Sequence, residues 1–208
     1  RRSVIKNVKT KMTTVTLENT NYKDELKRKN SKPLLWIALV SIVMFFGGIT
    51  SAVIVSQGGG SFIAIPMPTG FTISTFVIVL SSIIFHFGYL SVKKGNYGMA
   101  KLSVGITFLL GLLFVVTQYM GWVTLHDSGF YLAGKESTQE SSFLYLITGL
   151  HIAHLIGGLV SLIIVLVKTF KKRYNAEDTV GMQVSLTYWH FLGGLWIYLF
   201  FFLRYSIA

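Results

Sequence analysis

The stretch Ser142–Val167 has the sequence SFLYLITGLHIAHLIGGLVSLIIVLV and contains no Lys, Arg, Asp or Glu. A helix needs about 20 predominantly apolar residues to cross the roughly 30 Å hydrocarbon core of a bilayer. Helices are the expected form there, because lipid offers the backbone no hydrogen-bonding partner. The stretch therefore predicts a transmembrane helix.

Four other stretches share this character, and the five together make up more than half of the 208 residues. The predicted spans are Pro33–Ser56, Phe71–Val92, Leu102–Val123, Ser142–Val167 and Val184–Leu203. A hydrophobic content of 52% and a mean hydropathy of +0.59 also lie far from the average of soluble proteins. The predicted fold class is all-α, an integral membrane bundle of five transmembrane helices.

The predicted spans contain no aspartate or glutamate. Proteins that move protons or cations through the bilayer usually keep carboxylates at membrane depth despite their cost. The chain also has no cysteine, which excludes thiolate metal sites and thiol nucleophiles. Because the Ser and Thr residues in the spans lack a carboxylate to orient a base, we expect no catalytic residue in this chain.

The basic residues indicate the orientation of the chain. Of nineteen Lys and Arg residues, all but Lys135 and Arg204 precede the first span, or lie between spans two and three or spans four and five. By the positive-inside rule these regions face the cytoplasm, so the amino terminus is expected inside and the carboxyl terminus outside. This placement explains the net charge of +11 better than nucleic-acid binding does.

Two regions follow from this pattern: a basic cytoplasmic tail over residues 1–32 and a five-helix membrane domain over residues 33–208. The tail has no apolar run of the kind found in a cleaved leader. We expect it to be disordered and attracted to anionic lipid. A weak amphipathic helix over Tyr22–Asn30 is the alternative.

Span four carries a regular pattern of small residues and two histidines. Its small residues recur every four positions and predict a stripe that another helix can approach closely: Gly149, Ala153, Gly157 and Ser161. His151, His154 and Gly158 fall on the neighbouring face. Span four is therefore expected to be a tightly packed interior helix.

Four histidines lie within or at the edge of the spans: His86, His151, His154 and His190. Neutral imidazole can ligate haem iron, copper or zinc, and a pair from two facing helices, such as His151 with His190, could hold a haem. The alternative is that these imidazoles make hydrogen bonds between helices or to lipid head groups. We favour the alternative and expect no metal ligand in this chain.

Two strings carry a resemblance to a known family. They are Thr148-Gly-Leu-His-Ile-Ala-His-Leu-Ile-Gly-Gly158 and Tyr188-Trp-His-Phe191, the second followed by Trp196. The residues of this signature are Thr148, Gly149, His151, His154, Gly157, Gly158, Tyr188, Trp189, His190, Phe191 and Trp196. Weaker agreements are Met44, Phe45, Phe46, Pro68, Thr69, Ser81, Ser82, His86 and Gln118. From about Pro33 to Tyr205, the chain resembles subunit III of haem-copper terminal oxidases in its five-helix bacterial form.

The resemblance implies a non-catalytic accessory subunit in the bacterial cytoplasmic membrane. Such a subunit packs on oxidase subunit I in a complex that also contains subunit II, binds phospholipid, and leaves haem and copper to its partners. His86, Gln118 and Arg204 are then candidates for lipid or interhelical contacts. Two alternatives are the related accessory subunit of a nitric oxide reductase and a second, divergent subunit III copy in the same oxidase. A membrane b-type cytochrome and a transporter fit the sequence less well.

The chain departs from the family pattern at three positions where the family usually or often has carboxylates. Ile42, Gly121 and Gly193 occupy these positions. The resemblance therefore implies that packing and lipid binding are retained, whereas a role in proton uptake is lost.

Overall fold

The structure is a computed structural model that describes residues 2–57, 65–134, 137–171 and 179–207. Its five helices are α1 (Arg2–Gln57), α2 (Thr69–Lys93), α3 (Tyr97–Asp127), α4 (Gln139–Phe170) and α5 (Val180–Ser206). All five are long and apolar enough to cross a membrane, which confirms the predicted all-α bundle of five spans. Four of the basic residues used to assign orientation lie outside the described residues: Arg1, Lys135, Lys172 and Arg173.

Helix α1 begins at Arg2, so the expectation of a disordered tail is wrong for these residues. The stretch before Pro33 contains no glycine or proline and is rich in lysine, which favours helix. Pro33 lies inside the helix, although it lacks a backbone donor. The chain divides into two compact units, residues 1–38 and residues 39–208.

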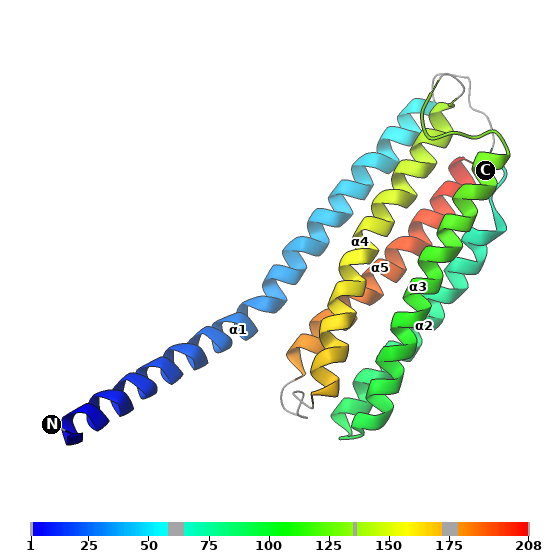
Figure 1. Cartoon of the computed structure of the whole chain (residues 1–208). Coiled ribbons are helices and arrows are strands. Elements are labelled where there is room, and N and C mark those ends of the chain that lie inside the picture. The colour runs from blue at the N-terminus through cyan, green and yellow to red at the C-terminus, as the bar shows by residue number, and fades with distance from the viewer. Residues whose placement is uncertain (1, 58–64, 135–136, 172–178, 208) are drawn as a thin grey trace. The chain divides into compact units, whose positions relative to one another are not determined.

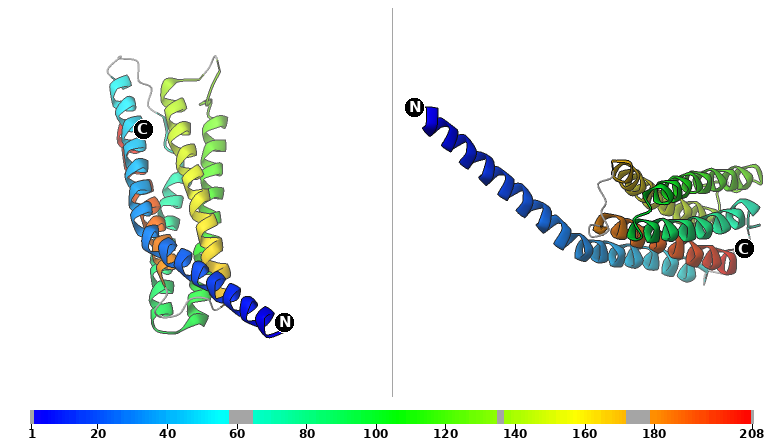
Figure 2. Two further views of the ribbon diagram at one scale, coloured as in Figure 1. Left: turned by 90° about the vertical axis from the view of Figure 1, so that its left-hand side faces the viewer. Right: turned by 90° about the horizontal axis from the view of Figure 1, so that it is seen from below.

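Four helices of the second unit close into a ring. Helix α2 contacts α3, α3 contacts α4, α4 contacts α5, and α5 contacts α2 (Figure 1). A tight turn joins α2 to α3, in which Gly95 adopts a φ of 75° and the Asn96 side chain accepts from the Met99 amide. The ring therefore has one shared interior. Figure 2 shows the helices from two further sides.

Side chains are sorted between this interior and the outer surface. The largest fully buried side chains of the ring are Phe71, Phe85, Phe114, Trp189 and Trp196. Large apolar side chains also cover the outside, where Phe76 is 74% and Leu109 is 64% exposed. An outer surface of this kind suits lipid or a partner subunit rather than water.

The second half of α1 lies against the ring through one periodic face. Leu39, Phe46 and Val53 are buried and recur every seven residues. The Tyr198 hydroxyl of α5 donates to Thr50 Oγ1 over 3.2 Å. At the far end of α1, the Gln57 amide donates to the carbonyl of Ser206. These contacts place the ends of α1 and α5 together.

Candidate functional site

Two tryptophans, one in the Tyr188–Phe191 string and the other at Trp196, form part of the interior. Trp189 and Trp196 lie two turns apart on one face of α5 and are 1% and 0% exposed. The Trp189 indole donates to Ser81 Oγ over 3.1 Å, and the Trp196 indole donates to Thr75 Oγ1 over 3.0 Å. Both acceptors belong to α2, so the two hydrogen bonds set the register between α5 and α2.

The Thr148–Gly158 string ties α4 to α3 in the same way. The Trp122 indole of α3 donates to Thr148 Oγ1 over 3.0 Å, and the Thr148 hydroxyl donates to the Leu144 carbonyl over 2.7 Å. The Tyr145 hydroxyl donates to the Trp122 carbonyl over 3.1 Å. The interior thus pairs indole donors with small hydroxyl acceptors, which leaves few polar atoms unsatisfied.

Gly158 has the closest contacts of the glycines in the string, and it lies beside the predicted small-residue stripe rather than within it. A Cβ added at Gly158 would meet Leu192 at 2.9 Å and Trp189 at 3.2 Å. At Gly157 the nearest atom would be the Tyr188 hydroxyl at 3.6 Å, an ordinary contact. Ala153 and Gly157 are exposed. The middle of the stripe therefore faces outward, whereas Ser161 is half-buried with its Oγ 2.7 Å from Ser185 Oγ of α5. The adjacent face packs into the ring.

His151 lies in the interior enclosed by the four-helix ring. It is 0% exposed, and its ring centroid lies 5.9 Å from that of Phe114 and 5.2 Å from that of Trp196. Among the described residues, neither of its ring nitrogens has a hydrogen-bond partner. Gln118 is equally buried; its amide donates to Ser74 Oγ over 2.6 Å, and its carbonyl oxygen has no partner among the described residues.

His154 packs at the contact between α4 and α1. Its Nδ1 lies 2.7 Å from the Leu150 carbonyl, and its ring centroid lies 5.5 Å from that of Phe46. The Tyr188 hydroxyl donates to the His154 carbonyl over 3.1 Å. The His154 imidazole therefore bonds within its own helix, and hydrogen bonding of the intramembrane histidines between helices or to lipid head groups stays a prediction.

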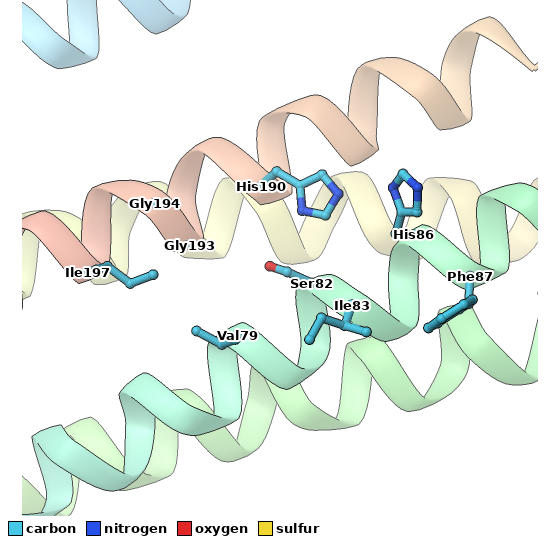
Figure 3. Close-up of a pocket in the computed structure, with 9 residues that line it drawn as sticks. All are labelled: Val79, Ser82, Ile83, His86, Phe87, His190, Gly193, Gly194 and Ile197. Atoms are coloured by element: carbon cyan, nitrogen blue, oxygen red, sulfur yellow. The ribbon is translucent and has the colours of Figure 1, made fainter.

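The sequence raised the possibility that His151 and His190 together hold a haem, but the contacts between aromatic rings do not pair these two imidazoles. His190 lies instead beside His86 of α2, with ring centroids 5.8 Å apart. The two rings line a cavity of about 440 Å³ between α2 and α5, together with Ser82, Gly193 and Gly194 (Figure 3). Among the described residues, no group of three or more His, Cys, Asp or Glu side chains is placed to hold a metal.

Apolar packing surrounds two of the three positions at which the resemblance implies carboxylates. A Cβ at Gly121 would lie 2.5 Å from Cε1 of Phe71, so the Phe71 ring fills the space that a larger side chain needs. Ile42 is half-buried and packs against the apolar core. Gly193 is buried, and a Cβ there would meet Ser82 Oγ at 3.1 Å. Arg204, the last candidate from the sequence, is exposed near the end of α5.

Sequence reasoning missed the hydroxyl acceptors of α2. Thr75 and Ser81 lie six residues apart on α2, and their donors Trp196 and Trp189 lie seven apart on α5, so similar spacings of donors and acceptors on two spans were a usable signal. It also missed the Phe71 ring beside Gly121 and the pairing of His86 with His190. Local spacing carries no signal for either contact.

Comparison with known proteins identifies the family. The family described as cytochrome c oxidase subunit III matches residues 35–207, which include nearly all of the five spans. This chain belongs to the cytochrome c oxidase subunit III family. The probable cytochrome c oxidase subunit 3 of Mycobacterium tuberculosis is 31% identical over 80% of this chain and 82% of its own length.

Other relatives of this subunit III family member carry the same subunit name. Cytochrome c oxidase subunit 3 of Corynebacterium diphtheriae is 30% identical over 76% of this chain and 79% of its own length. Cytochrome bo(3) ubiquinol oxidase subunit 3 of Pseudomonas aeruginosa is 27% identical over 79% of each chain. The similarity that shows the family thus extends over most of the membrane domain.

Proposed function

We propose that this chain is the non-catalytic accessory subunit III of an aerobic respiratory cytochrome c oxidase in a bacterial cytoplasmic membrane. Haem and catalytic copper belong to partner subunits I and II in this proposal. The supporting observation is the family match over residues 35–207. The 31% and 30% identities to cytochrome c oxidase subunits of two bacteria support the same assignment.

Packing on subunit I is assigned to the outward face of α4. Ala153 and Gly157 are exposed there one turn apart, and small residues let the backbone of another membrane helix approach closely. The stretch Ser142–Val167, to which this face belongs, contains no Lys, Arg, Asp or Glu. We therefore assign its contacts to van der Waals packing rather than ion pairing.

Phospholipid binding is assigned to a groove between α3 and α4. The groove has a volume of about 540 Å³ and an apolar lining that includes Leu102, Ile106 and Leu166. Lys101 lies at one end, with its ammonium 5.2 Å from the centroid of the Phe170 ring. An acyl chain along the groove would bring a lipid phosphate toward this cation, and a basic residue near the membrane surface attracts anionic lipid.

One copurification tests the oxidase proposal. The full chain carrying a histidine-free affinity tag is isolated from its native membrane in mild detergent, and the bound subunits and optical spectrum are recorded. We expect subunits I and II, haem bands and oxygen consumption with reduced cytochrome c. Nitric oxide turnover would favour the reductase alternative, a second subunit III would favour the divergent copy, and absence of haem-copper subunits would refute the proposal.

Orientation is tested with the same chain. It has no native cysteine, so one introduced thiol reports one site. We propose that the amino terminus and the turn at Lys94 are cytoplasmic and that Ser128 and the carboxyl terminus are outside. In intact spheroplasts a membrane-impermeant maleimide should label Ser128→Cys and spare Lys94→Cys. The reverse pattern would overturn the assignment.

A further inference from the structure

Two polar side chains in the ring interior carry atoms that no hydrogen bond among the described residues satisfies. They are the carbonyl oxygen Oε1 of Gln118 in α3 and both ring nitrogens of His151 in α4. Both side chains are 0% exposed, so bulk water does not reach them. A neutral imidazole offers one N–H donor and one acceptor nitrogen, whereas an amide oxygen only accepts. The interior thus holds a buried donor and a buried acceptor that each need a partner.

Gln118 and His151 lie at nearly the same depth in the bundle. Helices α3 and α4 are neighbours that run in opposite directions (Figure 1). The hydrogen bond from Trp122 to Thr148 sets their register. Gln118 precedes the first of these residues by four positions, and His151 follows the second by three. The two backbone positions therefore differ in depth by about 1.5 Å, the rise of one helical residue.

Helices α2 and α5 complete the same layer of the interior. The Gln118 amide donates to Ser74 Oγ over 2.6 Å, and the Trp196 indole donates to Oγ1 of the adjacent Thr75 over 3.0 Å. The Trp196 ring centroid also lies 5.2 Å from that of His151. Gln118 and His151 thus share Trp196 and one turn of α2 as neighbours, and their unpaired atoms belong to one polar layer.

We propose that Gln118 and His151 hold one internal water molecule between them. The water accepts the imidazole N–H of His151 and donates to Oε1 of Gln118. Buried waters in folded proteins typically bond to groups that otherwise lack a partner, and such a bridge is nearly as favourable as a direct hydrogen bond. The predicted spans contain no aspartate or glutamate, so a neutral ligand suits this layer better than a cation does.

The layer around Trp189 provides an internal comparison. Trp189 is 1% exposed and lies two turns from Trp196 on the same face of α5. Its indole donates to Ser81 Oγ, and among the described residues no buried polar side-chain atom of this layer is left without a partner. The proposed water therefore lies beside Trp196 and not beside Trp189, although the two rings are equally buried.

Radiolytic labelling of the full chain tests this inference. Hydroxyl radicals formed from a bound water oxidise the side chains next to it, even where bulk water has no access. The chain in detergent is exposed to short X-ray pulses, and oxidation of each tryptophan is followed by mass spectrometry. We expect Trp196 to be oxidised several-fold faster than Trp189.

Variants of the two side chains show whether they hold the water. Gln118→Met keeps the side-chain size and removes the acceptor, and the Gln118→Leu, His151→Leu double variant removes both partners. Each should slow oxidation of Trp196 to the rate of Trp189. The Tm is not the readout, because released water regains its hydrogen bonds in bulk.

Thr117→Val is the matched control, because the Thr117 hydroxyl bonds within its own helix, to the Phe114 carbonyl. This variant should keep the fast oxidation of Trp196. Equally slow oxidation of Trp196 and Trp189 in the unaltered chain would overturn the inference. So would fast oxidation of Trp196 that persists in Gln118→Met and in the double variant. Because the isolated chain is used, the result does not depend on the oxidase proposal.

Discussion

The indole of Trp189 in α5 donates a hydrogen bond to the Ser81 hydroxyl in α2 across the interior of the ring, over 3.1 Å. Both residues are essentially unexposed, so neither atom has water as an alternative partner. The pair joins two helices through residues that are 108 positions apart in the sequence. It is therefore a sensitive probe of the tertiary arrangement.

Ser81→Ala should destabilise the chain by about 1 kcal/mol, because it leaves the Trp189 N–H buried without an acceptor. Thermal unfolding in detergent measures the change. Ser91→Ala is the matched control, since the Ser91 hydroxyl bonds only within its own exposed helical turn, to the Phe87 carbonyl. An equal loss in both variants would contradict the interhelical role of Ser81.

Gly157 and Gly158 are adjacent but should respond differently to the same substitution. Gly158→Leu should lower the Tm of the isolated chain, because the side chain must displace Leu192 and Trp189. Gly157→Leu should leave that Tm nearly unchanged and instead reduce the yield of subunit I on copurification. A normal complex with Gly157→Leu would refute the assignment of the outward α4 face to that contact.

Phe71 and Gly121 should behave as a coupled pair. Gly121→Ala should cost about 1–3 kcal/mol, because its Cβ would lie 2.5 Å from the Phe71 ring. The Phe71→Leu, Gly121→Ala double variant should be more stable than the sum of the single effects predicts. Gly105→Ala, where a Cβ would meet nothing within 4 Å, is the control. Additive losses in the thermal unfolding cycle would contradict the contact.

His151→Leu should leave the Tm unchanged or raise it. The substitution removes two buried nitrogens that have no partner among the described residues and substitutes an apolar side chain of similar size. The haem and copper content of the copurified complex should also be unchanged. A fall in metal content would show that His151 supports a cofactor, contrary to our assignment.

Lys101→Gln should reduce the anionic phospholipid that copurifies with the complex, because it removes the cation at the end of the α3–α4 groove. Native mass spectrometry of the complex measures the retained lipid. Lys94→Gln, in the turn between α2 and α3, is the charge-matched control. Equal retention in Lys101→Gln and the unaltered complex would place the lipid elsewhere.

The spans were predictable because the length of each run of apolar residues can be read directly from the sequence. The predicted Phe71–Val92 lies within Thr69–Lys93, and Ser142–Val167 lies within Gln139–Phe170. Each helix extends a few residues further, since polar residues can continue a helix beyond the hydrocarbon. Helix α1 extends furthest, because no glycine or proline interrupts it before Pro33.

The facing of each helix was less predictable, and α4 shows the reason. In a helix of a soluble protein, the polar face marks the side toward water. In α4, apolar residues occur on every side of the membrane-spanning part, so no such mark exists. The sequence around them therefore does not tell which of Gly157 and Gly158 faces the interior, although successive residues point about 100° apart. The same limit applies to His190. Its neighbour is His86 because α2 is the helix that packs beside α5, and local sequence does not predict the order of the helices in the ring.

The ring of Phe71 against Gly121 also constrains how this subunit can evolve. A carboxylate at position 121 would collide with that ring, so a single codon change there yields a chain with a damaged interior. Selection would have to pass first through a smaller residue at position 71, which itself leaves a cavity. Positions 71 and 121 are thus expected to vary together among sequences that keep this interior.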